Sequence, residues 1–229
     1  LKQSEGQLLA TNAYALLTSD YFPFSKTQCA VFKGTDRAVF LDKREFTGPI
    51  YTQIEEAVDF VLRNIRLGAT IDGLVRKEKY ELPPEAIREM IINAHCHRNL
   101  LDESCIQVAV YDDRLEVTSP GGLYNGLTYE EVMNGHSKIR NKAIANIFSQ
   151  MGLVEAWGSG IKRILNAAEK YGLPKPRIQE FDNMFRVELF RKNSLTKRER
   201  IDFIDELELG RRRDGESSEK GRRRIAILN

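Results

Sequence analysis

Hydrophobic residues recur every three to four positions in several stretches of the chain, and this spacing predicts helices. The expected helices are residues 7–18, 50–65 and 141–151, one that begins at Pro83, one that ends at Tyr171, and a short capped one over 128–133. Alternating hydrophobic and polar residues predict strands instead. These lie at residues 27–32, 38–41, 75–82, 105–111, 115–118, 177–181 and 185–190, with a connector over 66–74. Together they predict an α+β fold, in which a mixed sheet carries helices on one face and a small α/β segment precedes it.

The helix that begins at Pro83 carries a polar stripe along the border of its apolar face. Positions four apart lie one above another on a helix, so the three polar residues line up. A carboxylate and an amide beside a buried face are unfavourable unless something satisfies them. Ordinary hydrogen bonds or a bound metal–phosphate group would both do so. The stripe consists of Glu89, Asn93 and His97, and the apolar face of Ile87, Met90, Ile91 and Ala94.

Glycines at two places have the spacing of phosphate-binding turns. Backbone N–H groups at a helix N-terminus bind anions, and glycine lets a phosphate come close. Each place also has an ordinary explanation as a turn or cap glycine. The long polar segment 124–141 between them is typical of a functional loop or lid. The glycines are Gly121 and Gly122 after a strand, and Gly158 and Gly160 on either side of Ser159 at a helix start.

Charge is unevenly distributed along the chain. Residues 194–229 hold 10 Lys/Arg against 8 Asp/Glu, which leaves 25 of each in the rest of the chain. A neutral body argues against a broad nucleic-acid surface there. The arginine triples at 211–213 and 222–224 either bind phosphates or are simply solvated. Since no apolar period follows Gly210, we expect that this tail alone does not bind a DNA sequence specifically.

Composition narrows the class of protein further. The three cysteines lack metal-ligand spacing, which favours reduced thiols and a cytoplasmic protein. No stretch approaches 18 apolar residues, so no membrane-spanning helix is expected. The start of the chain has neither an initiator methionine nor a signal-peptide core, and we expect a fragment of a longer protein. Residues 95–97 (His-Cys-His) point about 100° apart on a helix, so they do not predict a zinc site.

Glu89, Asn93 and Ala94 form a Glu-x-x-x-Asn-Ala motif on a helix. This motif resembles the N-box of the GHKL ATPases, the Bergerat fold of histidine kinases and gyrase. A longer string resembles the RecG-related transcriptional regulators, in which a divergent GHKL-like ATPase domain follows a Schlafen/AlbA-type domain. The string consists of Arg88-Glu89, Asn93-Ala94, His97-Arg98-Asn99, Ser119-Pro-Gly-Gly-Leu123, Arg140-Asn141 and Trp157-Gly-Ser-Gly-Ile161.

The resemblance implies three parts. Residues 1–74 would be the end of a Schlafen/AlbA-type domain, and residues 75–193 a divergent GHKL-like ATP-binding domain. Residues 194–229 would be a charged tail, with Thr196–Leu209 resembling the first helix of a truncated winged helix. The helicase label of such relatives has no counterpart here, because the chain contains neither a Gly-x-x-x-x-Gly-Lys-Ser/Thr loop nor an Asp-Glu-x-His box.

The resemblance also implies roles for single residues. Glu89 would be the general base that orients the attacking water, and Asn93 would bind the nucleotide and help to hold Mg²⁺. Ser119 stands where the family usually has an aspartate that reads the adenine amino group, and a hydroxyl accepts a hydrogen bond less strongly than a carboxylate. The remaining nucleotide-binding residues would be Gly121, Gly122, Gly158, Ser159 and Gly160.

Two functions follow as hypotheses. The first is a Mg-ATP-binding module, with slow or no turnover, that regulates attached DNA-binding parts of a transcriptional regulator. The second is a degenerate GHKL-like scaffold that binds no nucleotide and serves as an interaction module, with Ser119 as the mark of the loss. The expected partners are ATP and DNA, the latter through parts at or beyond the ends of the chain, while a homo-oligomer is left open.

Overall fold

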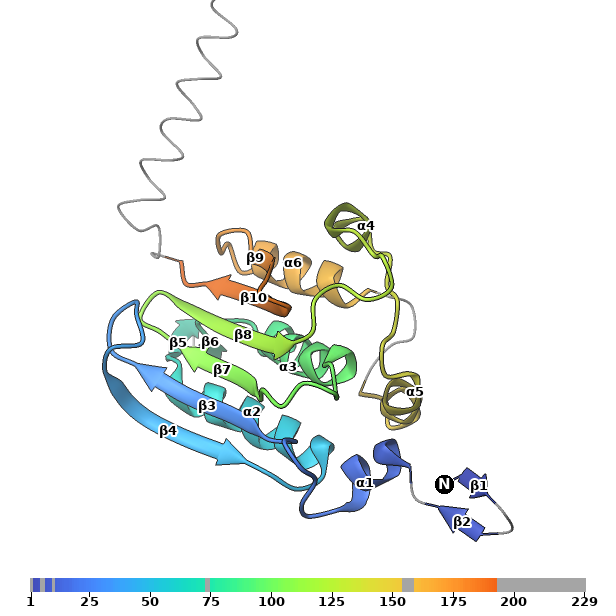
Figure 1. Ribbon diagram of the computed structural model, residues 1–229. Helices are drawn as coiled ribbons and strands as arrows, with labels where there is room; N and C mark the ends of the chain where they lie inside the picture. Colours follow the sequence, from blue (N-terminus) through green and yellow to red (C-terminus); the bar gives the residue numbers. More distant parts are fainter. Residues whose placement is uncertain (1, 5–6, 10, 73–74, 154–158, 193–229) are drawn as a thin grey trace, which may run out of the picture. The chain divides into compact units, whose positions relative to one another are not determined.

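The computed structural model describes residues 2–4, 7–9, 11–72, 75–153 and 159–192 (Figure 1). The chain divides into two compact units, residues 1–192 and residues 193–229. The second unit lies outside the described residues. The expectations for the charged tail, including the helix after Thr196 and both arginine triples, therefore stay predictions.

A six-stranded mixed sheet is the centre of the first unit (Figure 1). Its strands follow in the order β4 (Phe40–Phe46), β3 (Thr27–Phe32), β7 (Ile106–Val110), β8 (Arg114–Pro120), β10 (Met184–Phe190) and β9 (Arg177–Phe181). Only the β3–β7 pair is parallel, and the other neighbours in this sheet are antiparallel. Two separate antiparallel ribbons join β1 (Lys2–Ser4) to β2 (Gln7–Leu9) and β5 (Leu67–Asp72) to β6 (Val75–Tyr80).

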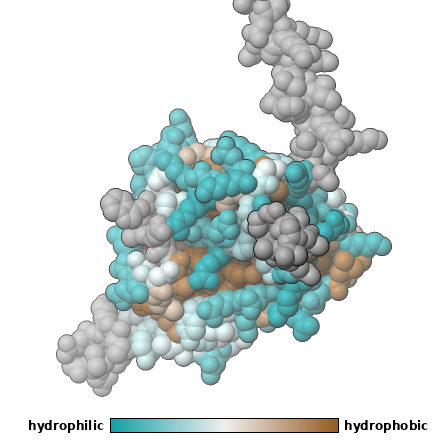
Figure 2. Space-filling view, turned by 180° about the vertical axis from the view of Figure 1, so that it is seen from behind, coloured by the Kyte–Doolittle hydropathy of each residue, from teal (hydrophilic) through white to brown (hydrophobic). Residues whose placement is uncertain are grey.

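Helices cover one face of this sheet, as expected for the α+β class. Helices α2 (Ile50–Asn64) and α3 (Pro84–His97) pack on the strands, and α3 also contacts α5 (Lys142–Gln150) and α6 (Gly160–Lys170). Helix α1 (Asn12–Thr18) contacts α2, and α4 (Tyr129–Met133) contacts α6. Figure 2 views this helix-bearing side, where hydrophobic residues form a band between hydrophilic borders. The predicted mixed sheet with helices on one face is thus confirmed.

Three elements differ from the sequence prediction. The helix expected over residues 7–18 begins at Asn12, because the Thr11 side chain caps it by accepting a hydrogen bond from the Tyr14 N–H at 3.3 Å. The connector expected over 66–74 contains strand β5, in which Leu67, Ala69 and Ile71 alternate with Gly68 and Thr70. The strand expected over 38–41 is β4, which extends to Phe46. Its charged residues conceal the pattern because it is an edge strand with little burial.

The domain boundary expected at residue 74 lies between strands that belong to the same sheet. Strand β3 precedes it and β7 follows it, and they pair from Thr27 opposite Ile106 to Val31 opposite Val110. Residues 1–192 accordingly form one compact unit. A Schlafen/AlbA-type origin of residues 1–74 stays a prediction about family relationship.

The other face of the sheet is covered by arginine side chains that pair with two buried glutamates. Glu116 is 2% exposed and accepts from Arg37 at 2.5 Å and Arg114 at 3.3 Å. Glu188 is 3% exposed, accepts from Arg177 at 2.5 Å, and forms an ion pair with Arg114, whose Nε lies 3.1 Å from its Oε1. These charge-assisted bonds satisfy both carboxylates. Because side chains alternate along a strand, the residues between them on β8 and β10 face the helices.

His95 is a buried neutral histidine in the helix layer. Its ring Nε2 lies 3.2 Å from the Thr27 hydroxyl, which donates to Gln53 at 3.0 Å. Burial, and to a smaller extent the charge of Arg98, lower the pKa of His95 to about 3. A histidine whose pKa is lower in the folded than in the unfolded chain binds its proton more readily after unfolding. Its contribution to stability is therefore present above the unfolded pKa of about 6.5 and is lost as the pH falls toward the folded value.

We expect the free energy of unfolding to fall by about 2 kcal/mol on account of His95 between pH 6.5 and pH 5, given about 1.4 kcal/mol per pH unit. Urea titrations at the two pH values measure this change. The His95→Gln variant should show a flatter pH dependence, and His136→Gln, at an exposed histidine, should keep the native slope. An equally steep slope in His95→Gln would show that His95 does not carry the effect.

Candidate functional site

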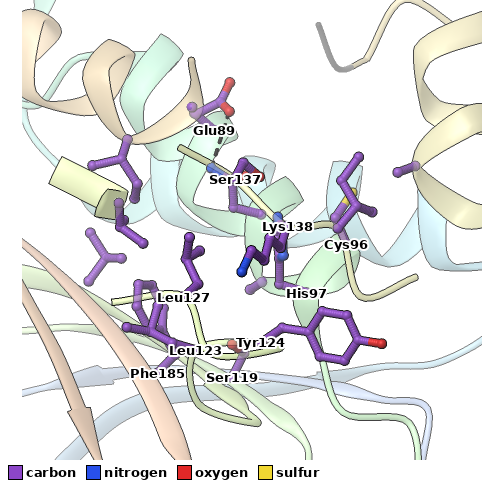
Figure 3. A pocket seen from close by; sticks show the side chains of 18 of the residues that line it. Glu89, Cys96, His97, Ser119, Leu123, Tyr124, Leu127, Ser137, Lys138 and Phe185 are labelled. Carbon is purple, nitrogen blue, oxygen red and sulfur yellow. Dashed lines mark hydrogen bonds between the residues drawn. The ribbon is translucent and has the colours of Figure 1, made fainter. Parts of the chain in front are cut away.

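A cavity of about 460 Å³ lies on the helix-bearing side of the sheet (Figure 3). Its walls come from α3, the ends of β8 and β10, the segment that follows β8, and the starts or inner faces of α5 and α6. This size is within the range of small-molecule sites. The cavity brings together residues that are distant in the sequence, from Glu89 to Val187.

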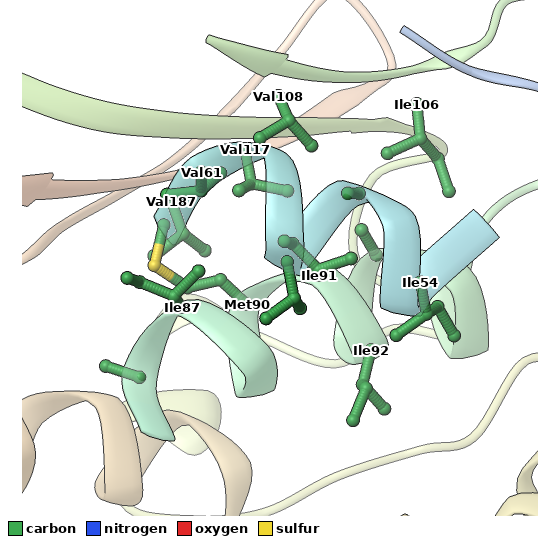
Figure 4. Packing of buried hydrophobic residues seen from close by; sticks show 14 of the residues in the cluster. Ile54, Val61, Ile87, Met90, Ile91, Ile92, Ile106, Val108, Val117 and Val187 are labelled. Atoms are coloured by element: carbon green, nitrogen blue, oxygen red, sulfur yellow. The ribbon is translucent and has the colours of Figure 1, made fainter. Parts of the chain in front are cut away.

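Helix α3 separates the core from the cavity. Pro84 occupies its first turn, where a missing N–H is tolerated, and Glu85 suits the positive end of the helix. One side is hydrophobic core: Ile87 and Ile91 are fully buried among residues of α2 and the sheet (Figure 4). The polar stripe predicted from the sequence lies along the cavity. Glu89, Asn93 and His97 all line it.

Glu89 and Asn93 form a bonded pair at one end of the cavity. The Asn93 amide donates to Glu89 Oε1 at 3.1 Å, and Glu89 is only 8% exposed. Figure 3 labels Glu89 and shows a hydrogen bond to it as a dashed line. The Arg163 guanidinium lies 3.4 Å from Glu89 Oε2. Arg163 was not anticipated as a site residue, although its position three residues after Gly160 places it on the first turn of the same helix. This end of the cavity therefore combines a carboxylate and an amide, and a cation that does not line the cavity pairs with the carboxylate.

Helix α6 begins directly against this pair. A Cβ atom added to Gly160 would lie 2.5 Å from Glu89 Oε1 and 2.6 Å from Asn93 Nδ2, so only glycine fits without a shift. Ser159 precedes it as the N-cap residue and makes no capping bond with its side chain. The first N–H groups of a helix lack partners inside the helix and attract anions. Gly158 lies outside the described residues, and its expected role stays a prediction.

The cavity floor is built by two paired strands. Val117 and Ser119 of β8 lie opposite Val187 and Phe185 of β10, and all four face the helices. Ser119 is 3% exposed. Within the described part of the chain, its hydroxyl has no hydrogen-bond partner. An apolar floor with one polar group is typical of a ligand site.

The turn after β8 is held tightly at both sides. Gly121 has φ +97°, and a Cβ there would lie 2.9 Å from Asn99 Cβ. The Gly121 N–H donates to the Asn183 carbonyl at 2.7 Å, and the Asn99 N–H donates to the Pro120 carbonyl at 2.7 Å. A Cβ at Gly122 would collide with the Glu180 carboxylate. Both glycines line the cavity, and their close contacts explain why no larger residue stands there.

The segment after this turn covers the cavity mouth. Arg140 donates to the Gly122 carbonyl at 2.7 Å, and its guanidinium lies 4.9 Å from the centre of the Tyr124 ring. Lys138 lines the cavity and donates to the Asn125 carbonyl at 2.9 Å. The short helix α4 has the predicted capping box at Thr128, which is confirmed. A lid movement of residues 124–141 stays a prediction.

Seven of the eight predicted site residues line one cavity. They are Glu89, Asn93, Ser119, Gly121, Gly122, Ser159 and Gly160. The sequence reasoning missed the cations Arg163 and Lys138, because neither belongs to a motif. It placed Arg140 and Asn141 in the resemblance string without a role. Asn141 proves to cap the end of α3, donating to the carbonyls of Cys96 and Arg98 at 3.1 and 2.8 Å.

The donor set near Glu89 fits a magnesium ion only if other ligands accompany it. Among the described residues, no group of three or more His, Cys, Asp or Glu side chains is placed to hold a metal. Mg²⁺ commonly takes one or two ligands from the protein and the rest from substrate phosphates and water. Glu89 and Asn93, beside a helix N-terminus, suit an ion that arrives with a phosphate group.

Comparison with family models gives a match for residues 103–189, to the family described as "Putative ATP-dependent DNA helicase recG C-terminal". This segment is similar to RecG-related, ATPase-like domains. The match includes Ser119, Gly121, Gly122 and Gly160 and begins after α3, so Glu89 and Asn93 precede it. A comparison with curated proteins gave no match.

Among solved structures, the fold is similar to that of the DIP2311 protein from Corynebacterium diphtheriae. The TM-score is 0.71 at 24% sequence identity, and the similarity covers 81% of this chain but 38% of the other. This chain thus spans less than half of that protein, and the likeness concerns the fold. Within the residues that the structure describes, no helix has the length and hydropathy needed to cross a membrane.

Proposed function

We propose that the cavity binds Mg-ATP and that the nucleotide state of this domain regulates DNA-binding parts of a transcriptional regulator. The observation that carries the proposal is the close approach of the α6 start to the Glu89–Asn93 pair. A helix N-terminus, a carboxylate and an amide converge there around a glycine. Such a combination suits a phosphate group with its metal ion.

The cavity has two chemically different ends. Glu89 and His97 are eight residues apart on α3, which at 1.5 Å per residue separates them by about 12 Å. Glu89, Asn93 and Gly160 lie at one end, and Arg163 pairs with Glu89 there without lining the cavity. His97 belongs to the other, beside the turn of Gly121, because the Asn99 N–H bonds to Pro120. A nucleoside triphosphate has the same division, with charged phosphates at one end and a flat base at the other.

Each residue at the phosphate end would have a distinct task. The N–H groups at Gly160 would bind phosphate oxygens, and Asn93 would offer its amide oxygen to Mg²⁺. Glu89 would accept a proton from a water molecule placed beside the terminal phosphate. Magnesium, when bound, supplies neutralisation of the phosphate charge, and phosphoryl transfer depends mainly on such neutralisation and on positioning. Lys138 would add a cation from the cavity mouth.

The DNA-binding parts of the proposed regulator would lie outside the cavity. The family description names a DNA helicase, but this chain has no Gly-x-x-x-x-Gly-Lys-Ser/Thr loop with which to power one. Its residues 1–193 are neutral in charge, and its basic triples lie in the tail. We therefore assign DNA contact to parts at or beyond the chain ends, and nucleotide binding to the cavity.

Isothermal titration of the full chain with Mg-ATP tests the proposal. We expect saturable binding with a dissociation constant below about 1 mM, equivalent to about −4 kcal/mol or stronger. No binding at millimolar nucleotide by folded protein would reject it. The degenerate scaffold would then be the better account, since Glu89 would be only a structural partner of Arg163.

The Asn93→Ala variant is expected to reduce the dependence of ATP affinity on Mg²⁺. In the native protein, replacing Mg²⁺ by EDTA should weaken binding, and the variant should lose most of that difference. Titrations with and without Mg²⁺ measure it for both proteins. Asn146→Ala, which also removes an amide from the cavity wall, is the matched control and should keep the native dependence. An unchanged Mg²⁺ effect in Asn93→Ala would remove Asn93 as a metal ligand.

A further inference from the structure

The floor of the cavity contains a hydroxyl that lacks a partner. Ser119 is 97% buried, lines the cavity, and forms no hydrogen bond within the described residues. A hydroxyl that is open to a cavity and has no protein partner there can form a hydrogen bond to a ligand or a water molecule. Figure 3 shows this side chain at the cavity floor with Phe185 and Leu123. Ser119 is thus placed to contact a ligand.

His97, at the same end of the cavity, also offers both a hydrogen-bond donor and an acceptor. His97 lines the same wall, and burial together with Arg140 lowers its pKa, which favours the neutral imidazole. The neutral ring has one donor and one acceptor nitrogen. Glu180 lies beside the same turn, but its carboxylate accepts from the Leu123 N–H at 3.1 Å and does not line the cavity. The described lining residues at this end therefore include no carboxylate.

A hydroxyl and a carboxylate select different ligands. An ionised carboxylate only accepts hydrogen bonds, so where it faces the 6-position it favours a 6-amino group and repels a 6-oxo group. A hydroxyl rotates and can accept from the amino group or donate to the oxo group. A pocket that requires one hydrogen-bond pattern rejects the other strongly, because its own polar group is left without a partner. Ser119 imposes no such requirement.

We infer that the cavity accepts purine nucleoside triphosphates without discriminating between a 6-amino and a 6-oxo group. This inference rests on the proposed nucleotide function and specifies its substrate class. The flat, apolar surface of Val117, Phe185 and Val187 contacts the ring of either purine. The end of the cavity at Glu89 and Gly160 binds the triphosphate, which the two nucleotides have in common.

Competition between ATP and inosine triphosphate for the full chain tests the inference. The two differ only at the 6-position and in the proton on the adjacent ring nitrogen. We expect their dissociation constants to agree within about threefold for the native protein. The Ser119→Asp variant should prefer ATP by at least about tenfold, because its carboxylate repels the oxo group. Ser137→Asp, which adds a carboxylate to an exposed cavity residue, should alter both affinities alike and keep the native ratio.

The outcomes separate the inference from the function on which it rests. Native protein that binds ATP more than about threefold tighter than inosine triphosphate overturns the inference and leaves the nucleotide function standing. An unchanged ratio in folded Ser119→Asp overturns it as well. Absence of binding by either nucleotide overturns both. If Ser119→Asp does not fold, as judged by its thermal unfolding, the native ratio decides.

Discussion

Replacing Gly160 with alanine is expected to weaken Mg-ATP binding by about 10- to 100-fold, the value of charge-assisted hydrogen bonds at one phosphate position. The new methyl group would lie within 2.6 Å of Glu89 Oε1 and Asn93 Nδ2, and these side chains must turn away. Because both contacts are ends of side chains, and alanine favours helices, the free energy of unfolding should change by less than about 1 kcal/mol. Titration calorimetry and urea unfolding measure the two quantities.

Gly68→Ala is the matched control for this result. A Cβ there meets only the Lys79 carbonyl at 3.5 Å, an ordinary contact in a strand away from the cavity. It should leave ATP affinity unchanged. Native affinity in Gly160→Ala would contradict the placement of phosphate at the start of α6, and so would an equal loss of affinity in Gly68→Ala.

The Glu89→Gln variant is expected to separate binding from hydrolysis. Glutamine keeps the size of the side chain and its acceptor for the Asn93 amide, but it cannot take a proton from water. Whatever ATP hydrolysis the native protein shows should fall by about 10²- to 10⁴-fold, the usual contribution of a general base. Affinity for Mg-ATP should stay the same or rise, because one negative charge near the triphosphate is removed. A coupled phosphate-release assay and calorimetry measure the two effects.

Glu85→Gln provides the comparison on the same helix, since Glu85 is exposed in the first turn of α3. It should change neither quantity. Undiminished hydrolysis in Glu89→Gln would remove Glu89 as the base. Weaker binding in Glu89→Gln would instead make its carboxylate a ligand-holding group.

Much of the fold follows from local sequence patterns. Helices α2, α3 and α5 and strands β3, β7 and β10 were predicted within a few residues, because each has one buried face and a clear period. The prediction failed where burial does not set the pattern. Strand β4 is an exposed edge, and β5 pairs only with β6. The pairing of β3 with β7 also lay beyond the local pattern, since it joins segments about 80 residues apart in the sequence.

The sequence predicted the glycines and the polar stripe of the candidate site. The spacing of Glu89 and Asn93 fixes their common side of α3, and the glycine pairs mark turns. The reason for Gly160 could not be foreseen, because its contacts depend on how α6 packs against α3. The same holds for Arg163, whose partner Glu89 lies 74 residues earlier. The place of Ser119 at the cavity floor likewise depends on the pairing of β8 with β10, in which Ser119 lies opposite Phe185.

The central claim is that one cavity, between α3, β8 and the start of α6, binds the nucleotide. Amide hydrogen exchange of the full chain, followed by mass spectrometry with and without Mg-ATP, tests it most directly. We expect slower exchange in peptides from residues 84–97, 119–141 and 159–171, and unchanged exchange in residues 27–46. Protection confined to other parts of the chain, or none at saturating nucleotide, would contradict the claim.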